Sequence, residues 1–236
     1  IYTLSLHDAL PISIDLLKIR ASFGRTGNDD IGNYTSRKYY ITQNLLGIEG
    51  LVRANAGNPD LQWEAVTSLN GGIDLGLFNE RLAISFDAYQ HKTNNMLVTT
   101  AAPEASGISY TTTNSGAMKT NGWEAAVNGR ILEKSELKWD LGFTIAHSRS
   151  IVTRLPREKL LTEFAGGTIL TSTGRGPNLF YGYKTAGVYA SDAAAASAGL
   201  SNKNTDGSTT PFSGGDLHFV DLTGDHVIDE DDRQII

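Results

Sequence analysis

Apolar and polar residues alternate along five stretches of this chain. In the first stretch Leu17, Ile19 and Phe23 are apolar, whereas Lys18 and Arg20 between them are charged. Successive side chains of a β-strand point to opposite faces, so a period of two predicts strands with one apolar and one polar face. The five stretches are 17–23, 68–77, 82–91, 123–131 and 137–146. The pattern therefore predicts an all-β chain.

The connections between these stretches are alternately long and short. Tight turns near 78–81 and 133–136 join the second stretch to the third and the fourth to the fifth. Roughly 40 residues separate the first two stretches and roughly 30 the third and fourth, far more than the 2–5 of a typical hairpin. Short periplasmic turns and long extracellular loops are typical of a transmembrane β-barrel. We therefore expect an antiparallel transmembrane β-barrel fragment of about five strands with long extracellular loops.

Composition is compatible with this fold. The mean hydropathy is −0.22, and no stretch approaches the ~18 apolar residues of a membrane helix. A barrel strand turns only alternate residues to lipid, so its average hydropathy stays near neutral. The net charge of −6 argues against nucleic acid as a partner. The absence of cysteine excludes disulfides and thiolate metal sites, and it suits an exported protein.

The chain divides into three segments by pattern. Residues 1–13, IYTLSLHDALPIS, resemble translated sequencing-adapter read-through, so we expect them to be non-native and to make no specific contact with the sheet. Residues 14–152 hold the predicted barrel strands and their loops. Residues 153–236 are expected to form an extracellular region with a helix near 191–200 and an Asp-rich tail.

No motif of catalysis is present, so we expect no enzyme and no catalytic residue. His91 and His147 are expected on the polar faces of their strands. Trp123 and Trp139 are expected in the aromatic girdles of the barrel, although aromatic residues of a soluble core would give the same pattern.

Aromatic residues of the predicted loops could stack on sugar rings. Packing of the loops against each other is the better explanation for each of them taken singly, so no substrate-binding residue is assigned. The candidates are Tyr34, Tyr39, Tyr40, Tyr110, Phe180, Tyr181 and Tyr183.

The tail contains an EF-hand-like spacing of oxygen ligands. Side chains fall at positions one, three, five, nine and twelve, and a backbone carbonyl falls at position seven. His226 occupies position six, where Gly is usual, and position twelve is Asp rather than Glu. We expect a calcium site here; the competing hypothesis is a turn held by aspartates that accept backbone N–H groups. The predicted ligands are Asp221, Thr223, Asp225, Val227, Asp229 and Asp232.

Six segments in order resemble the SusC/RagA-like, TonB-dependent outer-membrane transporters. They are LKIRASFGRTGN (17–28), NPDLQWE (58–64), GIDLGLFNERL (72–82), NGWE (121–124), FYGYKTAGV (180–188) and GGDLHFVDLTGDHVIDEDDR (214–233). The resemblance implies a C-terminal barrel fragment of a parent with about 22 strands and an internal plug. It also implies the outer membrane of a Gram-negative bacterium, contact with TonB through parts of the parent outside this chain, and a SusD-like surface lipoprotein. The imported nutrient would be a glycan or another oligomer such as a peptide.

A secreted all-β module that binds carbohydrate with calcium is the alternative. It would explain the loops and the Asp-rich tail without a membrane. Such a module needs a second sheet to cover the apolar faces of the strands, whereas a barrel turns those faces to lipid.

Overall fold

The structure is a computed structural model that describes residues 2–5, 14–28, 30–31, 33–108 and 110–236. The chain divides into two compact units, and each is described by itself. The first comprises 1–158 and 173–176, and the second comprises 159–172 and 177–236.

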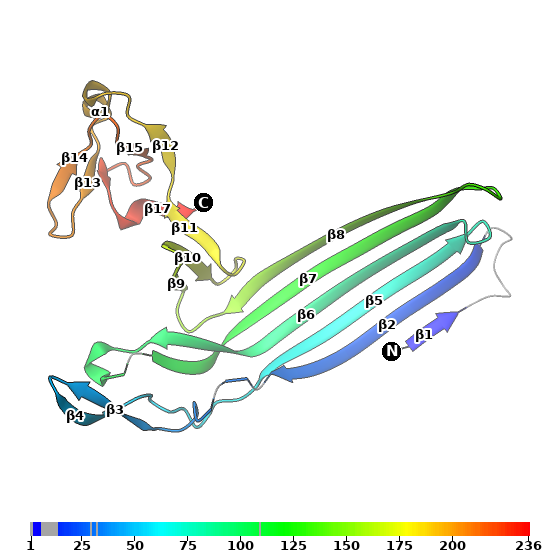
Figure 1. The fold of residues 1–236 in the computed structure, drawn as a ribbon, viewed down its shortest axis with the longest axis horizontal. Helices are drawn as coiled ribbons and strands as arrows, with labels where there is room; N and C mark the ends of the chain where they lie inside the picture. Colours follow the sequence, from blue (N-terminus) through cyan, green and yellow to red (C-terminus); the bar gives the residue numbers. More distant parts are fainter. Residues whose placement is uncertain (1, 6–13, 29, 32, 109) are drawn as a thin grey trace. The chain divides into compact units, whose positions relative to one another are not determined.

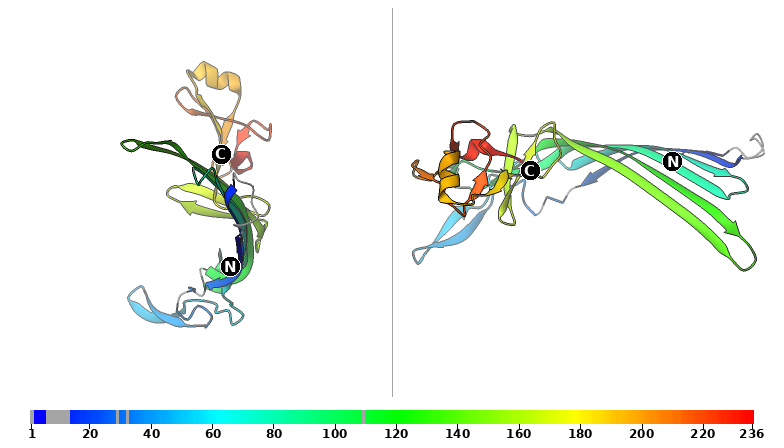
Figure 2. Two further views of the ribbon diagram at one scale, coloured as in Figure 1. Left: turned by 90° about the vertical axis from the view of Figure 1, so that its right-hand side faces the viewer. Right: turned by 90° about the horizontal axis from the view of Figure 1, so that it is seen from above.

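The first unit is built on one antiparallel sheet with the strand order β1-β2-β5-β6-β7-β8 (Figure 1). Figure 2 shows that this sheet is curved rather than flat, as a twisted sheet should be. Four of the predicted stretches lie within a strand and the fifth does so from residue 138 onward, so the five-strand prediction is confirmed. The long strands are β2 (Ile14–Asn28), β5 (Glu64–Leu77), β6 (Leu82–Ala101), β7 (Tyr110–Glu133) and β8 (Lys138–Arg154).

The first strand, β1 (Tyr2–Ser5), contradicts one expectation. We expected no specific contact between residues 1–13 and the sheet, yet β1 pairs antiparallel with Lys18–Ala21 of β2. The physical reason is that β2 presents an edge of unpaired backbone N–H and C=O groups, which any extended segment can satisfy. Residues 1 and 6–13 lie outside the described residues. The foreign origin of 1–13 stays a prediction, and an intact gene encoding LSLHDALPIS in frame within a barrel strand would contradict it.

Strand register separates two faces of the sheet. One row crossing the sheet consists of Leu17, Leu75, Ile84, Val127 and Phe143. Large side chains on this apolar face are open, with Phe23 74% exposed and Phe143 64% exposed. A row three positions further along β2 points to the opposite, polar face and consists of Arg20, Gly72, Asp87, Glu124 and Ala146. The alternation of the sequence therefore gives one apolar and one polar surface.

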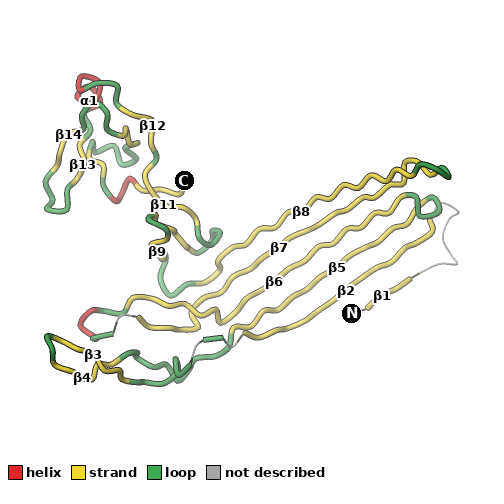
Figure 3. Tube along the Cα trace, viewed as in Figure 1, coloured by secondary structure: helices red, strands yellow, loops and turns green. Residues whose placement is uncertain are grey.

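The strands extend well beyond the amphipathic stretches. β6 and β7 continue to Ala101 and back from Tyr110, so the expected loop between the third and fourth stretches is mostly strand. A 3₁₀ turn, η1 (Glu104–Ser106), lies between the two strands. The long connection from β2 to β5 contains a further hairpin, β3 (Tyr40–Leu45) with β4 (Ile48–Arg53). Alternation does not mark these parts, as expected of barrel strands that extend beyond the apolar band. Figure 3 shows how much of the first unit is strand.

The second unit contains three small sheets. The four-stranded sheet has the order β17-β11-β10-β9. Its strands are β9 (Lys159–Phe164), β10 (Gly167–Ser172), β11 (Leu179–Tyr183) and β17 (Arg233–Ile235). The other sheets pair β12 (Thr185–Val188) with β15 (Leu217–Phe219), and β13 (Ser201–Lys203) with both β14 (Thr209–Pro211) and β16 (Val227–Ile228).

The predicted helix is confirmed as α1 (Asp192–Ala198). Ser191 caps its first turn by accepting a hydrogen bond from the Ala194 N–H, and Gly199 ends it in the left-handed conformation. A small core beside it includes Tyr189, which stacks on His218 with the ring centroids 4.5 Å apart. Among the described residues, no helix is long and apolar enough to cross a membrane.

Candidate functional site

An ionic cluster lies on the polar face of the first unit, across β2, β5 and β6. Arg20 donates to both carboxylate oxygens of Asp74, at 2.8 and 2.9 Å, and to both of Asp87, at 2.7 and 2.8 Å. The three side chains are 31%, 24% and 35% exposed. A guanidinium that binds two carboxylates bidentately is fixed in orientation as well as charge. The cluster therefore ties three neighbouring strands together.

Gly72 makes this cluster sterically feasible. It lies between Arg20 and Asp87 in the same row of the sheet. A Cβ at Gly72 would collide with the Asp87 carboxylate and come within 3.0 Å of the Arg20 guanidinium carbon. The guanidinium thus crosses β5 over a position that has no side chain.

Acidic and hydroxyl groups continue across this face beside the cluster. A hollow of about 340 Å³ is lined by Ser85, Asp87, Glu124 and Thr144, among others. Oxygen-rich surfaces of this kind suit contact with water, polar solutes or a polar protein segment, as the inner wall of a barrel requires.

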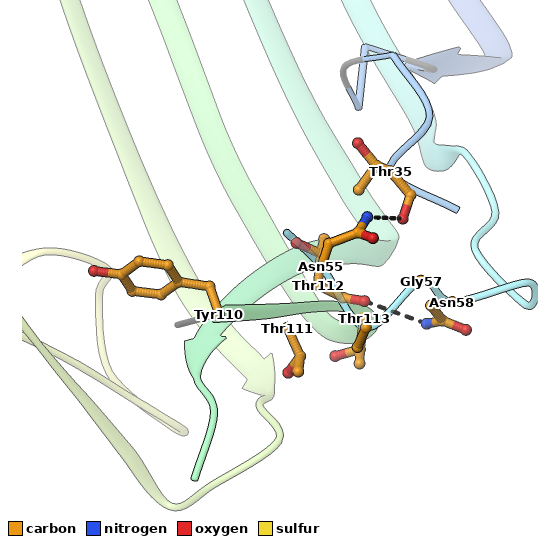
Figure 4. A pocket seen from close by; sticks show the side chains of 9 residues that line it. Thr35, Asn55, Gly57, Asn58, Tyr110, Thr111, Thr112 and Thr113 are labelled. Atoms are coloured by element: carbon orange, nitrogen blue, oxygen red, sulfur yellow. Dashed lines mark hydrogen bonds between the residues drawn. The ribbon is translucent and has the colours of Figure 1, made fainter. Parts of the chain in front are cut away.

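A second hollow, of about 300 Å³, lies at the end of the sheet that carries the long loops (Figure 4). Asn58 donates to the Thr112 carbonyl and Asn55 to the Thr35 carbonyl, both at 3.2 Å. Thr111 and Thr113 complete a lining of hydroxyl and amide groups, whereas the Tyr110 ring points away from them. The lining supplies uncharged donors and acceptors.

Asn114 fixes the loop that forms this hollow. It accepts from the Gln62 N–H at 2.8 Å and donates to the carbonyls of Gln62 and Asn95, each at 2.7 Å. The segment before β5 is therefore bound to the extended part of the β6–β7 hairpin. Sequence analysis missed this anchor, and the only available signal was the NPDLQWE segment that contains Gln62.

The loop aromatics fall into two groups. Tyr34, Tyr40, Tyr110 and Phe180 are between 64% and 72% exposed, and Tyr39 is 42% exposed, so their faces remain available. Tyr181 and Tyr183 contact the Arg233 guanidinium, which lies 5.0 and 5.9 Å from their ring centroids. Packing against Arg233 therefore explains the positions of Tyr181 and Tyr183.

The histidine prediction is half correct. His91 lies on the polar face, 2.8 Å from the Ser68 hydroxyl. His147 does not: it shares a row with Trp123 on the apolar face, with the ring centroids 6.4 Å apart. The error was one of parity, because His147 is two residues after Ile145 and therefore points to the same side. Trp139 is 52% exposed, and the girdle roles of both tryptophans stay predictions.

The Asp-rich segment folds as a loop held by its own hydrogen bonds. Asp221 accepts from the N–H groups of Gly224 and His226 at 2.6 and 2.9 Å. His226 has a φ of 64°, the left-handed conformation expected at position six, which costs a non-glycine residue about 1–2 kcal/mol. Asp232, fully buried, accepts from the N–H groups of Leu222 and Asp229 and ends the loop at the 3₁₀ turn η2 (Glu230–Asp232).

The ligand oxygens are only partly assembled for a cation. The Thr223 hydroxyl donates to Asp221 and Asp232, at 3.2 and 3.4 Å, so these three converge. Asp225 accepts from the Val227 N–H, and Asp229 forms an ion pair with Lys203 at 2.7 Å. No group of three or more His, Cys, Asp or Glu side chains among the described residues is arranged to hold a metal. The backbone thus fits the calcium prediction, whereas Lys203 competes for one ligand, and calcium binding stays a prediction.

Hydrogen bonding also sets the acidity of this loop. Lys203 and then the Asp231 N–H lower the pKa of Asp229 below its usual value. Desolvation raises the pKa of Asp221, but hydrogen bonds from Gly224, His226 and Thr223 outweigh it, so this pKa is also lowered. Both carboxylates are therefore held in the ionised form that a cation requires.

Comparison with known proteins identifies the family. Residues 12–213 match the family described as "TonB dependent receptor-like, beta-barrel". The chain belongs to this family. It is similar to TonB-dependent receptor P3 of Formosa agariphila, with 33% identity over 95% of this chain and 23% of the receptor. It is also 28% identical to TonB-dependent receptor SusC of Bacteroides thetaiotaomicron, over 59% of this chain and 15% of SusC.

A solved structure, the RagAB peptide transporter, is similar over 93% of this chain and 25% of that chain, with a TM-score of 0.71 and 27% identity. The chain thus spans about a quarter of the length of receptor P3 and of this structure. Members of the family are outer-membrane β-barrels of Gram-negative bacteria, and the matched relatives are receptors and transporters rather than enzymes. Family membership therefore favours the transporter over the secreted carbohydrate-binding module.

Proposed function

We propose that this chain forms part of the wall and external loops of an outer-membrane transporter that imports nutrient oligomers, glycans or peptides, into a Gram-negative bacterium. One observation carries the proposal. A single antiparallel sheet has an open apolar face on one side and, on the other, a polar face whose main charges pair with each other. A wall between lipid and an aqueous lumen has this construction.

The oligomer would meet this chain first at the loop end of the sheet. The hollow beside Asn58 and Thr112 offers hydroxyl and amide groups without a charged side chain in its lining. Such groups suit the hydroxyls of a sugar or the amides of a peptide, and the exposed tyrosines add faces for stacking.

The partners that we propose for this protein are based on its similarity to known transporters. Similarity to SusC and to the RagAB transporter supports a SusD-like lipoprotein over the external loops, with TonB acting through parts of the protein outside this chain. Transport of this kind uses gating and no covalent chemistry, so the protein would not be an enzyme.

Deletion of the full-length gene tests the proposal. In a strain without its paralogues, growth on one class of oligomer, glycan or peptide, should be lost while growth on the corresponding monomer is kept, and the wild-type gene should restore it. The class that is lost assigns the substrate. Unchanged growth on every oligomer would contradict import.

A further inference from the structure

A row of basic side chains crosses the apolar face near the loop end of the sheet. Arg25, Lys92 and Lys119 share one row, in which Thr67 separates Arg25 from Lys92. Arg149 lies on the same face one row nearer the centre, because it precedes by two residues Ile151, the partner of Lys119. Neighbouring strands lie about 4.8 Å apart, so these four cations, named here the basic row, fall within about 20 Å.

The basic row has no anionic partner within the sheet. None of its members forms an ion pair or a side-chain hydrogen bond with a described residue. The two rows that contain it carry no Asp or Glu. Lys92 and Lys119 lie directly opposite each other, and like charges at such positions are destabilising. On the polar face, by contrast, Arg20 is fully compensated by Asp74 and Asp87.

Along the strands, the basic row lies where the band of apolar side chains on this face ends. On β2, the apolar positions 17, 19, 21 and 23 end directly before Arg25. On β8, Arg149 lies ten residues beyond Trp139. Ten residues of a strand tilted by about 35–45° rise about 25 Å along the membrane normal, which equals the usual height of the apolar band.

We infer that the basic row binds the phosphate groups of an anionic lipid in the external leaflet of the outer membrane. The inference rests on the proposed function for the orientation of the sheet. Side chains on this face point away from the polar face, so lipid headgroups and not the imported oligomer meet them. Arginine binds phosphate bidentately and lysine adds point charges, and clusters of such residues at a membrane surface recognise anionic lipids.

Binding of lipid A, a bisphosphorylated outer-leaflet lipid, to the full-length protein in detergent tests this inference. We expect the wild type to bind lipid A at least tenfold more tightly than zwitterionic phosphatidylcholine, with affinity falling as salt is raised. The variant R25Q/K92Q/K119Q/R149Q should lose about tenfold in affinity for lipid A. The matched control R81Q/K134Q/K138Q, which neutralises cations at the other end of the strands, should bind as the wild type does.

Folding and function are checked separately. A heat-modifiable gel shift reports the closed barrel. If the quadruple variant does not show this shift, the double variant K92Q/K119Q is tested instead, with an expected severalfold loss of affinity for lipid A. R25K/R149K keeps the charge and should keep most of the binding. Equal lipid A binding by wild type and neutralised variants, or displacement by an equal concentration of inorganic phosphate, would overturn the inference. Failure of the growth test with lipid A binding intact would instead overturn only the import proposal.

Discussion

At the scale of single residues, the polar face depends on a glycine. The Arg20 guanidinium reaches Asp87 only because Gly72 leaves the space above β5 empty. Gly71, the residue before it, faces the apolar side of the sheet, and no atom lies within 4 Å of a Cβ built on it. Adjacent glycines in one strand therefore have different roles, and this pair allows a matched experiment.

Gly72→Ala should lower the stability of the full-length barrel by about 1–3 kcal/mol, because the methyl group forces the Arg20 and Asp87 side chains apart. Gly71→Ala should be neutral or stabilise by about 0.5–1 kcal/mol, since alanine restricts the unfolded chain and meets nothing. The temperature at which the folded gel band converts to the unfolded band measures both. Equal shifts for the two variants would show that the cluster does not depend on Gly72.

At the scale of elements, the loop from Asp221 to Asp232 is already ordered by its own hydrogen bonds. Aspartates accept backbone N–H groups at both ends of the loop, and Lys203 of β13 neutralises Asp229. This network satisfies the turn hypothesis, and it also gives the backbone of a cation-binding loop. Two predictions separate a cation-binding role of this loop from a purely structural one.

The first prediction concerns calcium. Titration calorimetry of the full-length protein should show calcium binding that Asp221→Ala with Asp225→Ala abolishes, because the loop loses two of its carboxylate ligands. Asp206→Ala, in another acidic turn of the same unit, serves as the control and should leave the titration unchanged. Identical titrations for all three proteins would leave the loop as a turn only.

The second prediction concerns pH in calcium-free buffer. Because the pKa values of Asp221 and Asp229 are lowered in the folded loop, their contribution to stability is complete above the unfolded value of about 4 and is lost as pH falls below it. Lys203→Met removes the main cause of the lowered pKa of Asp229, so loop opening should begin at a higher pH. Hydrogen–deuterium exchange of residues 221–232, corrected for intrinsic rates, measures the shift. Lys184→Met is the control, and an equal shift in it would contradict the role of Lys203.

At the scale of the whole molecule, the described sheet does not close. Its order runs from β1 to β8 with no pairing between these two strands, so each edge presents backbone groups without partners. Its apolar face, including Phe23 and Phe143, is open to the surroundings. Closure in lipid needs about eight strands or more, and the remaining strands must come from the rest of the protein.

The 236-residue chain expressed alone should therefore be insoluble, or refold in detergent without the heat-modifiable gel shift of a closed barrel. The full-length protein refolded in parallel is the positive control. A monodisperse, soluble monomer that unfolds cooperatively would instead revive the carbohydrate-binding module.

The sequence by itself determined the strands and their faces wherever apolar and polar residues alternate. In the proposed barrel wall, lipid on one side and water on the other impose a period of two. The positions from Leu17 to Phe23 and from Leu82 to His91 show this period directly. The helix expected near 191–200 was likewise predicted from the sequence and is present as α1. The same logic failed for β3, β4 and the distal parts of β6 and β7, where apolar and polar residues do not alternate regularly.

Only the tertiary structure decided which residues meet. Arg20 and Asp87 are separated by 67 positions, and Asn114 meets Gln62 across 52. The basic row joins Arg25 to Arg149. Each of these neighbourhoods depends on strand register, and a shift of one residue would turn every side chain of a strand to the other face. Alternation determines which face of the sheet each side chain takes, but it does not determine the register between neighbouring strands. Contacts across the sheet are therefore defined only when the strands assemble.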